Sequence, residues 1–392
     1  MGTSCSMCVK GKKRSLEYNC MDVRNSLEEE EEDRSVNQIP FLEEKIVFNI
    51  LTWLPAEELH NLTCVCRLWL RIIKSSSFIQ AHLRRSKPGL ITIEANCTTS
   101  PSVLLRTNIL KKQDDIIMVR EFTAPSRITW SSCNGLILLG RFVDTVGKLL
   151  LANPATKRLM QLPSPTHGTN SMFDHIFGMT YLPSIKTHKV IHWFTCSANN
   201  KMLGWEILTI GDRTWGRLKT CHTKLQIISE SRKIVFVKDV AHWVATEDDS
   251  KFVVSLDMIE DEDQIHKTEL PCCFSGVDEL LDIGGVLSFV SRVDNRSTHF
   301  DIWGLKDICE GNWVKQRTIR LEGVSKNLLV VGAAALENGK VIIFRAGEPS
   351  TYCYYTYDVQ LKQTRYLDFD SGKIALVLPH VDSLVSCRRL YF

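Results

Sequence analysis

Apolar residues spaced four apart define the first regular segment of the chain. The stretch IPFLEEKIVFNILTWLP (39–55) places Leu42, Ile46, Ile50 and Leu54 on one stripe, since residues four apart lie on the same face of a helix. Pro55 ends this helix and begins the next, because its fixed φ suits a first helical position. The pattern therefore predicts two consecutive helices that meet at Pro55.

A second apolar stripe follows with helical spacing. EELHNLTCVCRLWLRII (57–73) places Leu62, Val65, Trp69 and Ile72 on one face, at spacings of three and four. Three serines (75–77) end this helix, and FIQAHL (78–83) adds a final turn or two. A helical unit of about 45 residues is too small to be comfortable alone. We therefore expect its stripes to meet an external partner.

After about residue 89 the pattern changes to short β-rich runs separated by turn residues. One kind of run is a turn followed by an apolar strand, at 133–139, 186–194, 238–245, 283–290 and 337–344. The other is a strand, a polar turn and a strand, at 149–163, 205–218, 252–271, 300–316 and 354–367. The two alternate five times with a period of roughly 50 residues, which suits a four-stranded propeller blade of the kelch size. A β-sandwich or barrel is the alternative.

Residues 89–130 and 368–392 fit this repeat poorly, and we expect them to pair and close the ring. The predicted fold class is an α+β multidomain protein, with a small all-α region before an all-β, propeller-like domain. The predicted parts are a disordered tail (1–38), the helical region (39–84) and the β domain (89–392).

Composition narrows the class of partner. The 392 residues carry a net charge of +3, which indicates no general affinity for nucleic acid. No run approaches about 18 apolar residues, and no N-terminal apolar leader is seen, so we expect no spanning helix and no secretion. The expected location is the cytoplasm and nucleus, where the fourteen cysteines stay reduced.

Cys64 and Cys66 lie two residues apart, so they are candidates for a metal site. A helix turns about 100° per residue, so these two side chains point to nearly opposite sides and cannot share a metal. We interpret them as small buried apolar residues.

The remaining polar residues form no recognisable catalytic or metal-binding set. His188 and His192 share a strand face about 13 Å apart, which is too far for one metal. The acidic tip at 260–263 lacks the glycine and distal glutamate of a calcium loop. No nucleotide-binding, hydrolase or metalloprotease motif occurs. The sequence predicts no catalytic residue, no cofactor and no metal. Recurring tryptophans are interpreted as packing between blades, namely Trp205, Trp215, Trp243, Trp303 and Trp313.

The N-terminus carries an acylation pattern. MGTSCSMCVKGKKR (1–14) fits the myristoylation signal at Gly2 and Ser6, with Cys5 and Cys8 as candidate palmitoylation sites beside a basic cluster. Two lipid signals hold a protein at a membrane more stably than one. Peripheral attachment to the plasma membrane is therefore the alternative location.

Two resemblances give these patterns a meaning. The stripes of residues 39–84, the Leu54-Pro55 join and the segment CVCRLW (64–69) resemble the F-box, which docks substrate receptors onto the Skp adaptor of a cullin ubiquitin ligase. The resemblance implies an adaptor-binding set of Leu42, Ile46, Ile50, Leu54, Pro55, Leu59, Val65, Cys66 and Trp69.

The β region resembles the F-box-associated, kelch-like domain of plant receptors. The motifs that carry this likeness are SCNGL (132–136), NPAT (153–156), LP (162–163), DVAHW (239–243), GG (284–285), IW (302–303) and DSLVS (382–386). The resemblance implies a module that binds a protein substrate, whose identity the sequence does not give. The expected function is thus a non-catalytic substrate receptor of a Skp–cullin–F-box ligase. The alternatives are a membrane-tethered scaffold and a standalone propeller enzyme or ligand-binding protein.

Overall fold

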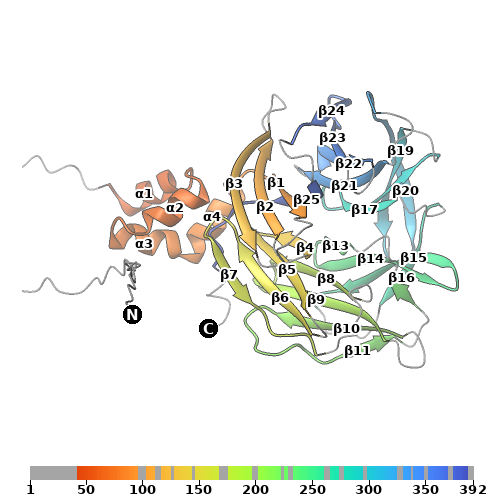
Figure 1. The fold of residues 1–392 in the computed structure, drawn as a ribbon, viewed down its shortest axis with the longest axis horizontal. Helices are drawn as coiled ribbons and strands as arrows, with labels where there is room; N and C mark the ends of the chain where they lie inside the picture. Colours follow the sequence, from red (N-terminus) through yellow and green to blue (C-terminus); the bar gives the residue numbers. More distant parts are fainter. Residues whose placement is uncertain are drawn as a thin grey trace, which may run out of the picture. The chain divides into compact units, whose positions relative to one another are not determined.

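The computed structural model describes residues 42–95, 103–110, 116–124, 128–143, 146–166, 175–196, 202–221, 225–227, 233–259, 265–272, 278–294, 298–324, 330–336, 339–347, 352–369 and 374–386. Residues 44–392 belong to one unit of the chain. It begins with four short helices and continues in β-strands (Figure 1). The helices are α1 (Glu44–Leu51), α2 (Ala56–Leu62), α3 (Arg67–Lys74) and α4 (Ser76–Arg85).

Two helices begin at the breakers in the sequence, whereas α1 ends at Leu51, before the predicted Pro55. Pro55 precedes α2, and Ser75 starts α4 by accepting a hydrogen bond from the Phe78 amide at 3.2 Å. The single helix predicted across residues 57–73 is wrong. The chain turns at residues 63–66, where Cys66 has an extended backbone (φ −157°, ψ 167°), and α2 and α3 are separate helices.

The strands form six antiparallel sheets, which we number as blades in chain order. Each has a continuous path of four strands, and blade 4 has one further strand that pairs with β14. Blade 1 combines β25 (Ile374–His380), β1 (Gly89–Ala95), β2 (Val103–Leu110) and β3 (Ile116–Ala124). Blade 2 contains β4 (Ile128–Cys133), β5 (Leu136–Val143), β6 (Val146–Asn153) and β7 (Arg158–Gln161). Blade 3 contains β8 (His175–Leu182), β9 (Thr187–Cys196), β10 (Met202–Thr209) and β11 (Lys219–Cys221).

The other three blades complete the set. Blade 4 contains β12 (Gln226–Ile227), β13 (Val235–Val237), β14 (Val240–Glu247), β15 (Ser250–Asp257) and β16 (His266–Glu269). Blade 5 contains β17 (Glu279–Asp282), β18 (Leu287–Arg292), β19 (His299–Asp307) and β20 (Asn312–Arg320). Blade 6 contains β21 (Val330–Leu336), β22 (Val341–Ala346), β23 (Cys353–Asp358) and β24 (Gln363–Leu367).

The blades form a closed ring. The first strands of neighbouring blades are in contact around it, and β25 lies between β21 and β4. The ring closes because β25 pairs antiparallel with β1, with Leu378 opposite Ile91. This is the pairing of the two chain ends that the sequence predicted. The propeller-like fold is confirmed, and the sandwich and the barrel are excluded.

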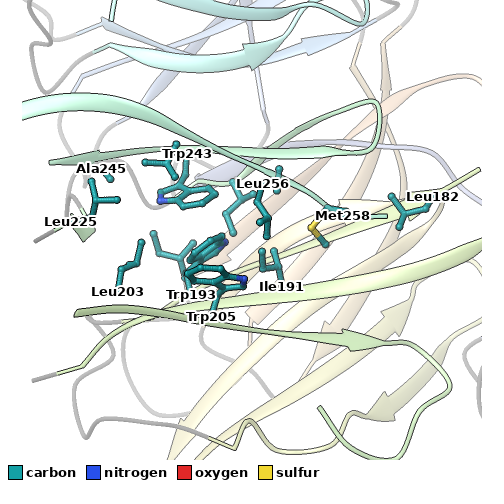
Figure 2. Close-up of a cluster of buried hydrophobic side chains, with 14 residues drawn as sticks. Leu182, Ile191, Trp193, Leu203, Trp205, Leu225, Trp243, Ala245, Leu256 and Met258 are labelled. Carbon is teal, nitrogen blue, oxygen red and sulfur yellow. The ribbon is translucent and has the colours of Figure 1, made fainter. Parts of the chain in front are cut away.

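An apolar cluster fills each of the six junctions between blades. Side chains alternate across a strand, so both faces of a central blade strand can be buried between neighbours. Figure 2 shows the junction of blades 3 and 4, where Trp193 and Trp205 lie beside Trp243, with Trp193 and Trp243 ring centroids 3.8 Å apart. The tryptophan prediction is confirmed for Trp205, Trp215 and Trp243, which are buried.

Candidate functional site

Helix α1 carries two apolar faces, of which one is buried and the other is exposed. Val47 and Leu51 point inward, into the core of the helical region. Ile46 and Ile50, one residue before each of them, point to solvent. Each pair is four residues apart and therefore shares a face. The exposed face is the one that the sequence assigned to a partner.

Exposed apolar side chains are concentrated in this part of the chain. Five of the eleven large apolar residues exposed in the described structure fall between residues 42 and 65. Leu42 (52% exposed) precedes the unit that begins at Glu44. The other four, which we call the exposed apolar set, are Ile46 (44%), Ile50 (51%), Trp53 (76%) and Val65 (58%). Single exposed apolar residues are normal in soluble proteins, whereas a concentration of them indicates an interaction site.

Trp53 belongs to this set although sequence reasoning missed it. It lies off the four-residue stripe, in the turn between α1 and α2. The Arg85 guanidinium lies 4.7 Å from the centre of its ring, which is a cation–π geometry. Arg85 also donates a hydrogen bond to the Thr52 hydroxyl, and α4 thereby holds the exposed indole in place. A tryptophan beside a helix-ending proline was the available signal.

The other predicted adaptor-binding residues differ in accessibility. Pro55 and Cys66 are exposed, while Leu54 and Trp69 are half-buried against the helical core. Leu59 is completely buried, with 0% of its surface exposed, and packs inside the helical region. Leu59 thus supports the surface from inside the helical region, and its place in the adaptor-binding set stays a prediction.

The two cysteines of the CVC segment also differ from expectation. Both Cys64 and Cys66 are exposed free thiols, so their interpretation as buried apolar residues is wrong. The cause is the turn between α2 and α3, which presents Cys64, Val65 and Cys66 to solvent instead of continuing one helix. Among the described residues, no group of three or more His, Cys, Asp or Glu side chains is placed to hold a metal.

The sequence motifs of the β region meet where the helices contact the propeller. The buried Asn153 side chain donates hydrogen bonds to the carbonyls of Ser383 (3.1 Å) and Val385 (2.8 Å). The Ser383 hydroxyl donates to the Asn134 carbonyl at 2.6 Å. Gly135 has φ +80°, and a side-chain carbon there would collide with Ser383. The CNG, NPAT and DSLVS motifs thus build one joint.

Helical residues pack on this joint. Ala155 and Leu384 of the propeller belong to the same buried cluster as the helical core. His82 in α4 is buried, and its Nε2 lies 2.9 Å from the Leu54 carbonyl. Burial lowers the pKa of His82, against the opposing effects of that hydrogen bond and of Asp382. A neutral ring that donates to Leu54 then fixes the turn that carries Trp53.

A polar group at the ring interior bears on the alternative of a propeller enzyme. Ser132 Oγ lies 2.8 Å from His380 Nδ1, and Asp382 Oδ1 lies 3.4 Å from His380 Nε2. Ser132 and His380 border a pocket of about 260 Å³. The His380–Asp382 distance is beyond an ordinary hydrogen bond, so the carboxylate does not orient the ring as a hydrolytic triad requires. The Ser132–His380 contact instead joins β4 to β25.

The acylation pattern at Gly2, Cys5 and Cys8 lies outside the described residues. Among the residues that are described, no helix has the length and apolar character to cross a membrane.

Comparison with known proteins agrees with both parts of the structure. A family model described as the F-box domain matches residues 40–80. A second, described as the F-box associated beta propeller domain, matches residues 92–379, which is well over half of the chain. The exposed apolar set falls within the first match and all six blades fall largely within the second.

Relatives from Arabidopsis thaliana align with most of the chain. One whose name carries the F-box designation is 23% identical over 354 residues, covering 83% of this chain and 86% of the relative. An F-box/kelch-repeat protein is 24% identical over 293 residues, covering 69% of this chain and 77% of its own length. The chain belongs to the family of plant F-box proteins that carry an F-box-associated β-propeller domain.

Proposed function

We propose that the protein is the substrate-recognition subunit of a Skp–cullin–F-box ubiquitin ligase. The observation that carries this proposal is the exposed apolar set within the residues matched by the F-box model. The partners are a Skp-family adaptor, through it a cullin, and a protein substrate held by the propeller.

The physical driving force for adaptor binding is burial of these side chains. Removing one large aliphatic side chain from water contributes about 1.5–3 kcal/mol before the costs of association. Trp53, Ile46 and Ile50 are large, and Trp53 is pre-positioned by Arg85, which limits the ordering cost. Val65 and Cys66 lie in the exposed turn that follows α2, and they would add further contacts with the adaptor.

The proposed role requires no catalytic group in this chain. A receptor that holds the adaptor and the substrate together raises the effective concentration of a charged conjugating enzyme near a substrate lysine. The receptor then contributes geometry, and the acid, base and nucleophile belong to its partners.

Charge substitution on the exposed face tests the proposal. We would replace Ile46 and Ile50 with aspartate in the full chain and measure binding to a purified Skp-family adaptor by calorimetry. Two buried charges at the centre of an apolar interface should weaken binding about a hundredfold or more. The matched control replaces Ile185 and Leu361, which have similar exposure on the propeller, with aspartate.

The outcomes separate clearly. The control should bind the adaptor normally, and both variants should melt like the parent because all four residues are exposed. Normal adaptor binding by the Ile46→Asp/Ile50→Asp variant would overturn the interface. Failure of the unmodified chain to bind any adaptor would overturn the receptor proposal itself.

We further propose that acylation at Gly2, with Cys5 and Cys8, attaches a fraction of the protein to the plasma membrane; the rest is in the cytoplasm and nucleus. The sequence pattern supports this proposal. A Gly2→Ala variant should lose the membrane fraction in cell fractionation, and an unchanged fraction would contradict it.

A further inference from the structure

A basic pocket lies on blade 3, and none of its lining residues belongs to the exposed apolar set. Its volume is about 570 Å³, within the range of about 300–1,000 Å³ typical of ligand sites. All of its lining residues lie between 189 and 219, and all are described. The pocket is therefore built from three consecutive strands and one loop.

Strand alternation places two lysines on the same face of the blade. Lys219 on β11 is the cross-strand partner of Trp205 on β10, and Lys189 on β9 is the partner of Thr209. Trp205 and Thr209 are four residues apart in one strand and so share a face. Trp205 forms the aromatic floor of the pocket, at the edge of the cluster drawn in Figure 2.

The loop between β10 and β11 adds two arginines. Arg213 and Arg217 line the pocket with exposed side chains. Within the described part of the chain, neither arginine forms an ion pair. Asp212 is the acidic residue on the same loop. The Lys189 ammonium donates to the Met258 carbonyl at 2.6 Å, so the two exposed arginines are the cations on which binding depends most.

The loop is fixed before any ligand binds. The Asp212 amide donates to the Thr209 carbonyl, and the Gly216 amide donates to the Ile207 carbonyl, both at 2.9 Å. The buried Trp215 indole donates to the Pro163 carbonyl at 3.1 Å. A preorganised loop lowers the entropy cost of binding, so the backbone that carries the two arginines is ordered without a ligand.

The other carboxylate beside the pocket is occupied. Glu206 lines it but alternates with Trp205 along β10, and its carboxylate is buried 2.8 Å from His192 Nδ1. Burial raises the pKa of Glu206, but the hydrogen bonds from His192 and Thr166 together lower it by more than burial raises it. The pKa of Glu206 therefore lies below its ordinary value. This carboxylate is bonded to blade residues and does not neutralise the arginines.

We infer that this pocket, formed by Lys189, Lys219, Arg213 and Arg217 around Trp205, binds an acidic segment of a protein through its carboxylate or phosphoryl groups. Arginine matches both groups with paired N–H donors, and lysine adds charge without fixed geometry. Charge complementarity selects the occupant: a polar hollow that is lined by lysines and carries two exposed arginines favours clustered anions over an apolar peptide. If the protein has the proposed function, the acidic segment belongs to a ubiquitination substrate. The binding of an acidic segment to this pocket does not depend on the proposed function.

The test uses the full chain alone and three fluorescent peptides with one neutral scaffold. One peptide carries a run of glutamates, the second carries phosphoserines at the same positions, and the third carries glutamines. Fluorescence anisotropy should show binding of the first two and none of the third. The relative affinity of the first two identifies the carboxylate or the phosphoryl group as the preferred source of charge.

Charge reversal locates the site. Arg213→Glu with Arg217→Glu should weaken acidic-peptide binding by about tenfold or more. The matched control, Arg317→Glu with Arg320→Glu, changes the net charge equally on exposed positions of β20 and should bind like the parent. Arg213→Gln with Arg217→Gln repeats the test if the reversed variant melts at a lower temperature.

Three outcomes would overturn the inference: no binding of either acidic peptide, equal weakening in the β20 control, or stronger binding of a single-stranded RNA of equal charge. The Ile46→Asp/Ile50→Asp variant should keep its peptide binding. Loss of adaptor binding and loss of peptide binding are thus separable, and each proposal can fail without the other.

Discussion

The helical region and the propeller place their apolar side chains in opposite ways. In the propeller, apolar residues fill six junctions between blades, and the exposed ones are scattered over several blades. In the helical region, α1 buries Val47 and Leu51 but exposes Ile46 and Ile50. The propeller buries most of its apolar surface within itself, whereas the helical region leaves a face of apolar side chains exposed.

This difference follows from size and topology. A ring of blades gives each central strand a neighbour on both faces, so little apolar surface is left over. Four short helices enclose only one small core, and they complete it with Ala155 and Leu384 from the propeller. Exposed apolar side chains contribute little to the stability of such a unit, and they are the ones that the proposed adaptor would bury.

A pair of tryptophan substitutions gives the largest expected contrast. Trp193→Ala removes a fully buried ring from the junction of blades 3 and 4 and should lower the free energy of unfolding by about 3–5 kcal/mol. Trp53→Ala removes an exposed ring and its stack on Arg85, and should cost less than about 1 kcal/mol. Thermal and urea unfolding measure both. Equal losses would show that Trp53 is structural and weaken its assignment to a binding surface.

The repeat in the sequence captured most of the propeller. Its two halves correspond to the second strand and to the third and fourth strands of blades 2 to 6. The first strands were missed because several are short, such as β13 (Val235–Val237) and β17 (Glu279–Asp282), and carry no alternation that stands out. Blade 1 was not visible as a repeat because its strands come from both ends of the β region.

The candidate site was only partly predictable. The stripe of Leu42, Ile46 and Ile50 was found from spacing, but spacing alone does not say whether a stripe faces inward or outward. Val47 and Leu51 form a second stripe on the same helix, and tertiary packing selects which one is buried. The exposed Cys64 and Cys66 were misassigned because one helix was assumed where the chain turns.

Acid should destabilise the propeller through its buried histidines. Burial lowers the pKa of His188 and of His242 to about 4 each. The unfolded chain binds these protons near pH 6.5 and the folded chain does not, so stability is lost as the pH falls from about 6.5 toward 4. Each histidine contributes a slope of about 1.4 kcal/mol per pH unit within that window.

Urea unfolding between pH 7 and pH 5 measures this slope. The double variant His188→Asn/His242→Asn should be less stable at pH 7 yet lose less stability on acidification. An unchanged slope in that variant would assign the acid sensitivity to other groups.

The joint between the two regions should depend on one buried amide. Asn153→Ala removes both hydrogen bonds to the carbonyls of Ser383 and Val385 and leaves those acceptors without this donor. The expected loss is about 1–3 kcal/mol, with faster proteolysis of the segment after β25. Hydrogen exchange of residues 381–386 locates the effect. Unchanged protection there would show that Ala155 and Leu384 hold the joint without Asn153.

The smallest expected effect concerns the ion pair that also connects the two regions. Lys157 Nζ lies 3.3 Å from Glu57 Oε1, and both side chains are partly exposed. Such a pair gains little Coulomb energy in water and loses side-chain freedom, so Lys157→Met should change the free energy of unfolding by less than about 1 kcal/mol. Lys157 has φ +53°, so methionine keeps the same backbone cost while removing the charge. Unfolding in low and high salt then isolates the charge. A larger, salt-dependent loss would mean that charge attraction, and not the buried contacts of Ala155 and Leu384, holds the helices to the propeller.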